Sequence, residues 1–346
     1  MAVNGSPELL IVMGASATAD QTEHVLARLQ EAGVTARVSR GREATVIGAI
    51  GERELLATLP LEGYPGVEQV VPILKPYKLV AREVSPDPTV IEVDGRKIGD
   101  EFFGLIAGPC TVETREQTLE TARAVADAGA TMLRGGAFKP RTSPYTFQGL
   151  GDTALEILRE AREETGLPVV TELMDPRHVE AVLGVADVIQ IGARNMQNFL
   201  LLAEVGRTDK PVLLKRAASA SVEELLMAAE YVAKEGNDRI ILCERGIRTF
   251  ETSTRYTLDL GSVAVLKHET HLPVIVDPSH AAGRRDLVLP LARAAAAVGA
   301  DGIIVEAHPR PEEALCDGPQ QIPTAEFGEF AREIVGIVEL MGKHVG

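Results

Sequence analysis

The chain has 346 residues, with 50 acidic and 35 basic side chains and a formal net charge of −15. This acidic balance argues against nucleic acid or an anionic membrane as the main partner, because both repel negative charge. With 45% apolar residues, 4% aromatic residues and no tryptophan, the composition indicates a globular protein with a large core, and it disfavours stacking surfaces for bases or sugars.

Residues 1–76 are predicted to form a small α+β domain of the ferredoxin-like type. An apolar strand at 9–13 precedes a helix that places Val25, Leu26 and Leu29 on one face and ends at Gly33. Strands at 35–39 and 45–50, a short helix at 52–59 and a strand at 67–74 complete a βαββαβ order.

Residues 77–98 are predicted to be a connecting segment. Residues 77–88 are punctuated by proline and read as a linker. Asp94-Gly95 lies between two short strands at 90–93 and 96–98, which is a strong hairpin signal. We therefore expect a linker followed by a hairpin that caps the next domain.

Residues 99–346 alternate short apolar strands with amphipathic helices, which indicates parallel strands buried on both faces. The predicted strands are 103–107, 132–134, 169–171, 188–191, 212–215, 240–243, 274–276 and 303–305. Eight such units over about 250 residues favour a closed (β/α)8 TIM barrel over an open doubly wound sheet. The chain also lacks Gly-x-Gly-x-x-Gly, the main sign of a dinucleotide-binding sheet.

Charged and polar residues follow these strands with a regularity that predicts an enzyme, because barrels of this class build active sites at the carboxyl ends of their strands. In chain order they are Cys110, Arg134, Lys139–Ser143, Glu172, Arg194-Asn195, Lys215-Arg216, Glu244-Arg245, Asp277–His280, Glu306 and His308.

The run LRGGAFKPRTSPYTFQG gathers Arg134, Lys139 and Arg141 with the hydroxyls of Thr142 and Ser143. Arginine, which can donate two parallel hydrogen bonds, and lysine, which carries a compact positive charge, are typical of phosphate and carboxylate recognition. A small anionic ligand is therefore expected. The simpler alternative is an ordinary solvated basic loop.

A second group of residues could hold a metal ion: Cys110, His280, Glu306 and Asp317. One thiolate, one imidazole and two carboxylates suit a single divalent ion such as Mn, Fe, Co or Zn better than Mg or Ca. Their spacing is too wide to be diagnostic, and Cys110 taken alone is more simply a small buried residue. Cys243, inside a strand, is expected in the core.

With these motifs in view, the chain resembles the metal-dependent 3-deoxy-D-arabino-heptulosonate 7-phosphate (DAHP) synthases, in the short microbial branch with an N-terminal ferredoxin-like regulatory domain. The motifs that carry the resemblance are AGPCTVE, LRGGAFKPRTSPYTFQG, LLKR, ILCERGIRTFE, VDPSHAAGRRD and VEAHPRPEEALCDGPQQ. The related 3-deoxy-D-manno-octulosonate 8-phosphate synthases typically have Lys-Ala-Asn-Arg-Ser-Ser where this chain has Lys-Pro-Arg-Thr-Ser. An octulosonate 8-phosphate synthase or a sialic-acid-type synthase remains the alternative within the same fold.

The resemblance implies roles for individual residues. It assigns the metal to Cys110, His280, Glu306 and Asp317, and phosphoenolpyruvate to Arg134, Lys139, Lys215 and Arg245. It assigns the protonation of the aldehyde oxygen to Lys139. It assigns erythrose 4-phosphate to Arg141, Thr142 and Ser143, with Arg284 or Arg285 at the distal phosphate. Where the family commonly has glycine after Lys-Arg, this chain has Ala217, which can narrow the backbone approach there.

The resemblance also implies the first step of the shikimate pathway, and feedback by tyrosine or phenylalanine bound between ferredoxin-like domains of a homo-oligomer, for which a tetramer is expected. A domain that only stabilises the oligomer, and a non-catalytic phosphate-binding or amino-acid-sensing protein, are the other possibilities. Three cysteines are a sparse, odd set that fits a reducing cytoplasm, and no membrane span is expected. Cys316, beside Asp317, could form a disulfide with Cys110 when metal is absent, and an inert structural thiol is the alternative.

Overall fold

The computed structural model describes residues 7–41, 45–51, 53–56, 58–72, 75–140, 143 and 145–346. It divides into two compact units, Met1–Pro88 with His268–His271, and Thr89–Lys267 with Leu272–Gly346. Among the described helices none is long and apolar enough to cross a membrane.

The first unit is a four-stranded antiparallel sheet with the order β2-β3-β1-β4. Its elements are β1 (Pro7–Met13), α1 (Ala19–Glu31), β2 (Thr35–Arg40), β3 (Thr45–Ile50), α2 (Arg53–Leu56) and β4 (Val67–Pro72). Helix α1 begins with a reciprocal capping box between Thr18 and Gln21 and packs Val25 and Leu29 into the core of the unit. This arrangement confirms the ferredoxin-like prediction. The predicted ends of the second helix and the last strand include residues 52, 57, 73 and 74, which lie outside the described residues.

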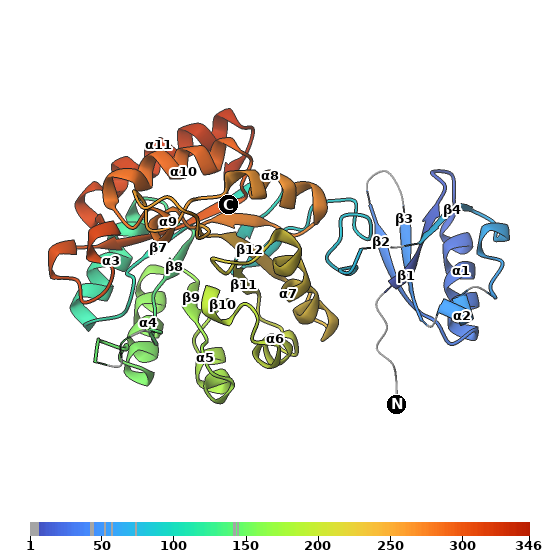
Figure 1. The fold of residues 1–346 in the computed structure, drawn as a ribbon, viewed down its shortest axis with the longest axis horizontal. Helices are drawn as coiled ribbons and strands as arrows, with labels where there is room; N and C mark the ends of the chain where they lie inside the picture. The colour runs from blue at the N-terminus through green and yellow to red at the C-terminus, as the bar shows by residue number, and fades with distance from the viewer. Residues whose placement is uncertain are drawn as a thin grey trace. The chain divides into compact units, whose positions relative to one another are not determined.

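The second unit contains eight parallel strands that close into a barrel, because β14 pairs with β7 (Figure 1). The strands are β7 (Phe102–Gly108), β8 (Met132–Arg134), β9 (Val169–Glu172), β10 (Val188–Ile191), β11 (Val212–Lys215), β12 (Ile240–Glu244), β13 (Val274–Val276) and β14 (Gly302–His308). The predicted TIM barrel is confirmed. Strands β8, β10, β11 and β13 coincide with predicted strands, and the others extend beyond them, so that Glu172, Glu244 and Glu306 lie inside strands.

Helices surround the barrel (Figure 1). They are α3 (Arg115–Asp127), α4 (Asp152–Thr165), α5 (Val179–Leu183), α6 (Phe199–Gly206), α7 (Val222–Lys234), α8 (Leu260–Glu269), α9 (Pro278–Ala282), α10 (Val288–Ala297) and α11 (Thr324–Leu340). Two short strands that the sequence did not reveal, β15 (Ile322–Pro323) and β16 (His344–Val345), pair with β14 and β7. Strands of two residues are too short to show an alternating pattern.

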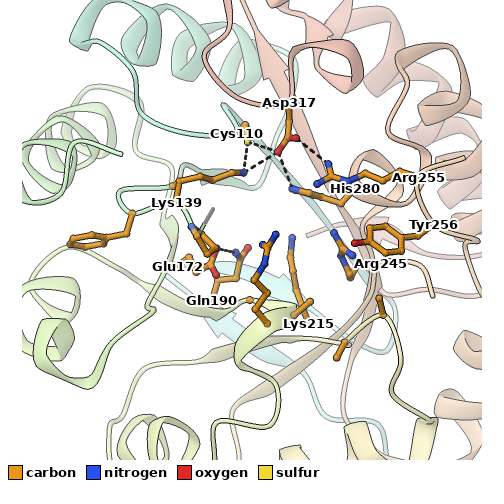
Figure 2. A pocket seen from close by; sticks show the side chains of 18 of the residues that line it. Cys110, Lys139, Glu172, Gln190, Lys215, Arg245, Arg255, Tyr256, His280 and Asp317 are labelled. Carbon is orange, nitrogen blue, oxygen red and sulfur yellow. Dashed lines mark hydrogen bonds and ion pairs between the residues drawn. The ribbon is translucent and has the colours of Figure 1, made fainter. Parts of the chain in front are cut away.

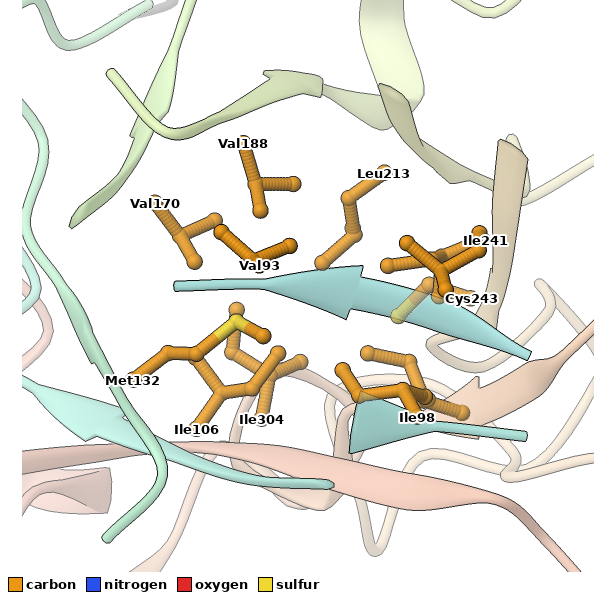
Figure 3. Close-up of a cluster of buried hydrophobic side chains, with 12 residues drawn as sticks. Val93, Ile98, Ile106, Met132, Val170, Val188, Leu213, Ile241, Cys243 and Ile304 are labelled. Atoms are coloured by element: carbon orange, nitrogen blue, oxygen red, sulfur yellow. The ribbon is translucent and has the colours of Figure 1, made fainter. Parts of the chain in front are cut away.

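A hairpin of β5 (Ile91–Val93) and β6 (Arg96–Ile98) fills one end of the barrel. Asp94 and Gly95 form its turn with φ angles of 47° and 79°, as a tight hairpin of this kind requires. Figure 3 shows Val93 and Ile98 among apolar side chains that point inward from the barrel strands, including Cys243. Because the hairpin directly precedes β7, it lies at the amino ends of the strands and leaves the carboxyl ends for a site.

Candidate active site

A cavity of about 700 Å³ lies at the carboxyl ends of the barrel strands (Figure 2). Positively charged side chains dominate its lining: Arg134, Lys139, Arg194, Lys215, Arg245, Arg248 and Arg255. Among the described lining residues, the carboxylates are those of Glu172 and Asp317. In a chain with a net charge of −15, this local excess of cations points to anionic ligands.

Adjacent residues at the strand ends point in different directions. The sequence pattern could not distinguish those that line the cavity from those that lie outside it. Lys215 and Arg245 line the cavity, and the Arg245 guanidinium carbon lies 4.5 Å from the centre of the Tyr256 ring. Arg216 is buried outside the cavity lining and donates from Nη1 to Glu244 and Asp259, both at 2.9 Å. The ends of β11 and β12 thus each supply one residue that lines the cavity, Lys215 or Arg245, and one that is paired outside the lining, Arg216 or Glu244.

Asp277 connects the cavity to the imidazole of His280. It caps the short helix α9 by accepting from the His280 backbone N–H at 2.9 Å, and its other oxygen lies 2.7 Å from His280 Nδ1. The same oxygen accepts from Lys215. Burial works against the charged carboxylate, but His280 and Lys215 hold the pKa of Asp277 well below its usual range. Asp277 therefore fixes His280 with Nε2 toward Glu306, at 3.3 Å from Oε1.

The four predicted metal ligands converge on one point. The ligand atoms of Cys110, His280, Glu306 and Asp317 all lie within 4.8 Å of one another, and the distance from Cys110 Sγ to Asp317 Oδ2 is 3.3 Å. They come from the end of β7, from α9, from β14 and from the loop after β14. A thiol, an imidazole and two carboxylates in one largely buried cluster fit a borderline divalent ion.

Lys139 places a positive charge against this cluster, with Nζ 2.7 Å from Cys110 Sγ and 3.1 Å from Asp317 Oδ2. Burial disfavours the ammonium, but Cys110, Glu306 and Asp317 raise the pKa of Lys139 above its ordinary value. Burial also raises the pKa of the Cys110 thiol, and contact with the Cys316 thiol adds to this. Because a metal binds the thiolate, metal binding here would release the Cys110 proton.

Glu172 and Gln190 form the other polar part of the cavity wall. Gln190 Nε2 donates to Glu172 Oε2 at 3.3 Å, and burial raises the pKa of Glu172. Gly192 allows this arrangement, since a Cβ there would lie 2.0 Å from Glu172 Oε1. The sequence analysis did not identify Gln190 as a cavity residue. A single polar residue in the apolar strand Val-Ile-Gln-Ile was a signal that could have identified it.

Most of the predicted site residues lie together. Cys110, Arg134, Lys139, Ser143, Lys215, Arg245, His280 and Asp317 line the cavity, and Glu306 lies beside them, 2.9 Å from Arg134 Nη1. Arg141 and Thr142 lie outside the described residues. Cys110 and Cys316 are both buried, and no disulfide joins them in the described structure.

Arg284 and Arg285 do not line the cavity, contrary to their expected place at a distal phosphate. Gly283 ends α9 in the left-handed conformation, with φ of 68°, and the two arginines that follow contact other groups. Arg284 pairs with the exposed Asp286, and Arg285 Nε donates to the backbone oxygen of Gln321 at 2.7 Å. Their expected place came from the family resemblance of the VDPSHAAGRRD motif.

Sequence reasoning also missed cavity residues in the loop between β12 and α8, namely Arg248, Arg255 and Tyr256. They lie several residues beyond the end of β12, so the rule of looking directly after each strand did not reach them. Arg194 and Glu172 had been noted at strand ends without a role.

The chain is similar to known proteins in both of its units. Residues 87–341 match the DAHP synthetase I family, and residues 9–75 match the DAHP synthase ferredoxin-like domain. The chain is 50% identical over 337 residues to phospho-2-dehydro-3-deoxyheptonate aldolase of Thermotoga maritima, covering 97% of this chain and 100% of the relative. It is 36% identical to 2-dehydro-3-deoxyphosphooctonate aldolase of Syntrophotalea carbinolica over 271 residues, covering 70% and 96%.

Two solved structures are similar to this one. The crystal structure of the Thermotoga maritima phospho-2-dehydro-3-deoxyheptonate aldolase (DAHP synthase) superposes with a TM-score of 0.78 at 48% identity, covering 98% of this chain and 99% of the other. A truncated form of the 3-deoxy-D-arabino-heptulosonate 7-phosphate synthase from the same organism gives a TM-score of 0.73 at 51% identity, covering 78% and 98%.

The buried Arg216–Glu244 pair yields a stability prediction. Arg216→Ala should lower the free energy of unfolding by about 3–5 kcal/mol, because it leaves the fully buried Glu244 carboxylate without its cation. The matched control is Arg293→Ala, which breaks an ion pair with Glu333 whose side chains are both more than 40% exposed and should cost less than about 1 kcal/mol. Urea unfolding followed by circular dichroism measures both, and equal losses would contradict the prediction.

Proposed function

The chain belongs to the DAHP synthetase I family, and we propose that its barrel cavity condenses phosphoenolpyruvate with erythrose 4-phosphate and water to give DAHP and inorganic phosphate. This is the first step of the shikimate pathway. The observation that carries the proposal is the convergence of a cation-lined cavity with a thiol, imidazole and carboxylate cluster at the same end of the barrel. Both substrates are anionic, and one of them carries the aldehyde to be activated.

Phosphoenolpyruvate is held by Arg134, Lys139, Lys215 and Arg245. Its phosphate and carboxylate need several cations in one place, and all four side chains line the cavity. Two multiply charged substrates would otherwise repel each other, so the cations bring the reacting carbons together. Arg194, on the same wall, adds a further positive charge.

Lys139 protonates the aldehyde oxygen as C3 of phosphoenolpyruvate attacks the aldehyde carbon. Its raised pKa keeps the ammonium charged at neutral pH, so that a proton is available to the oxygen as it becomes a hydroxyl. The new carbon–carbon bond leaves C2 electron-poor, water adds there, and loss of phosphate gives the ketone. The Arg and Lys side chains hold the phosphate throughout these steps.

Cys110, His280, Glu306 and Asp317 would hold one divalent metal ion, of the group Mn, Fe, Co or Zn. When bound, such an ion supplies a Lewis acid that polarises the aldehyde oxygen. The donor set and the close approach of the four ligand atoms support this assignment. The Asp277 hydrogen bond to Nδ1 supports it as well, because metal-binding histidines almost always donate their other ring N–H in this way.

Erythrose 4-phosphate binds to Arg141, Thr142 and Ser143 in the Lys-Pro-Arg-Thr-Ser segment. This assignment is supported by Pro140 and Ser143 of the same segment, which line the cavity. Arg284 and Arg285 are left out of this proposal, since they lie away from the cavity lining. The octulosonate 8-phosphate synthase reaction is less well supported, because the relative with that name is less similar and covers 70% of this chain.

The ferredoxin-like unit regulates the enzyme by binding tyrosine or phenylalanine between subunits of a homo-oligomer, for which we expect a tetramer in the cytoplasm. The match of residues 9–75 to the ferredoxin-like domain of DAHP synthases supports a regulatory role. The unit contributes no residue to the lining of the catalytic cavity among the described residues. Such control requires an effector with different affinities for two arrangements of the enzyme.

Cys110→Ala should lower kcat by more than about 100-fold. Removing a side chain that hydrogen-bonds to a metal ligand typically lowers metal affinity or activity about 10–100-fold, and removing the ligand itself should lower activity further. Phosphoenolpyruvate consumption with erythrose 4-phosphate measures the loss, with and without chelation and metal readdition. Cys243→Ala is the matched control, since Cys243 is a buried cysteine in the core and should retain activity. Near-normal turnover of Cys110→Ala after metal readdition would exclude it as a required ligand.

The aldehyde specificity can be tested directly. The kcat/KM for erythrose 4-phosphate should exceed that for arabinose 5-phosphate by at least about tenfold, because the distal phosphate must reach cations at a fixed distance from the reacting carbon. Steady-state assays with each aldehyde at saturating phosphoenolpyruvate give the ratio. A ratio near one would reject the four-carbon aldehyde as the preferred substrate.

A chain that begins at Tyr77 should keep catalytic activity and lose inhibition by millimolar tyrosine or phenylalanine. The catalytic cavity belongs to the other unit, and a truncated form of the Thermotoga maritima enzyme has a matching structure. Initial rates of both chains, measured with and without each amino acid, test this. Insensitivity of the full chain, or equal inhibition of the two chains, would refute the regulatory role.

A further inference from the structure

Each carboxylate in the metal cluster has one oxygen in the cluster and one oxygen held by another side chain. Asp317 Oδ2 lies 3.3 Å from Cys110 Sγ, while Oδ1 accepts from Arg255 Nη1 at 3.0 Å (Figure 2). Glu306 Oε1 lies 3.3 Å from His280 Nε2, while Oε2 accepts from Gln320 Nε2 at 2.6 Å. Neither Arg255 nor Gln320 has a part in the chemistry described above.

Arg255 and Gln320 also contact each other, because Arg255 Nη1 donates to Gln320 Oε1 at 3.2 Å. This contact fixes the orientation of the Gln320 amide. The reverse orientation would turn the amide oxygen toward a carboxylate and the amide NH2 toward a guanidinium, and both contacts would be repulsive. Gln320 is only 2% exposed, so water offers little alternative to these partners.

The backbone around these side chains is tightly held. The Arg255 N–H donates to the Ala282 oxygen at 3.1 Å, and a Cβ at Gly283 would lie 2.6 Å from the Arg255 Cβ. Asp317 is in the left-handed region with φ of 50°, and a Cβ at the next residue, Gly318, would lie 2.4 Å from a backbone oxygen. Both side chains therefore approach the carboxylates from segments with little freedom to move.

We propose that Arg255 and Gln320 are positioning residues of the metal site, which hold one oxygen of Asp317 and one of Glu306 so that each carboxylate offers a single oxygen to the ion. The inference rests on the proposed metal site and deepens it. Arg255 also ties the loop between β12 and α8 to a ligand that follows β14. Lys139 and Arg134 hold only the oxygen that each carboxylate directs into the cluster. Without the contacts of Arg255 and Gln320, the second oxygen of each carboxylate could therefore turn toward the ion.

Simple electrostatics makes the opposite prediction, which allows a clean test. Arg255→Ala removes a positive charge beside the site, and Gln320→Glu adds a negative charge of nearly the same size and shape as the native amide. Both variants make the surroundings of the ion more negative, so Coulomb attraction alone would tighten metal binding. Positioning requires both variants to bind the ion more weakly.

The experiment uses the full chain and Co²⁺, whose binding is measured by competition with a chelator and by the visible spectrum. Both variants should bind Co²⁺ about 10–100-fold more weakly than the unaltered chain. The visible bands should also change, since they report the number of ligands. Arg248→Ala is the matched control. It removes a cation from the same loop and cavity, but in the described structure its side chain is not hydrogen-bonded to Asp317 or Glu306, so Co²⁺ binding should not weaken.

Thermal melting of the metal-free proteins establishes that the variants fold. Binding of Co²⁺ by a folded variant as tightly as by the unaltered chain, or more tightly, with unchanged bands, overturns the proposal for that residue. Failure of the unaltered chain to bind Co²⁺ would instead overturn the metal site itself. The two failures are thus distinguishable.

Discussion

The cavity at the carboxyl ends of the barrel strands depends on buried carboxylates, whose negative charge balances the positive charge of many arginine and lysine side chains. Seven arginine and lysine side chains line one cavity, and like charges at this density repel one another. Carboxylates from the ends of other strands compensate two of these cations, in the pairs Arg134–Glu306 and Lys215–Asp277. Arg216, outside the cavity lining, pairs with Glu244 in the same way. Because these groups are almost fully buried, losing one partner would leave a charge that water cannot reach.

The two ends of the barrel have different tasks. The hairpin of β5 and β6 and the inward-pointing apolar residues make one end a packed core. The polar cavity occupies the other end, where strand ends from the whole barrel meet. Since the hairpin fills the amino end, substrates, water and products are expected to share the opening at the carboxyl end.

The sequence predicted the parts of the protein that depend on local pattern. Strand periodicity located the barrel strands, and polar residues directly after them identified Cys110, Arg134 and Lys215. The pattern could not predict that Lys215 lines the cavity while Arg216 lies outside it. The direction of each side chain depends on the carboxylates that other strands place near it. It also failed for residues deep in loops, such as Arg255 and Gln320, whose place is set by contacts between distant segments. Arg284 and Arg285, which were assigned by family resemblance, do not line the cavity.

Asp277 connects the cavity to the cluster that contains His280. One carboxylate oxygen of Asp277 contacts both Lys215, which lines the cavity, and His280, which belongs to the cluster of Cys110, His280, Glu306 and Asp317. A substrate anion that draws Lys215 toward itself changes the field at the imidazole, and an ion that draws charge from the imidazole changes the field at Lys215. Under the proposed assignment of metal and substrates, occupancy of the two sites would be thermodynamically linked, and linkage of this kind is reciprocal. On that assignment, a substitution of Asp277 would change the affinity for metal and the affinity for substrate together.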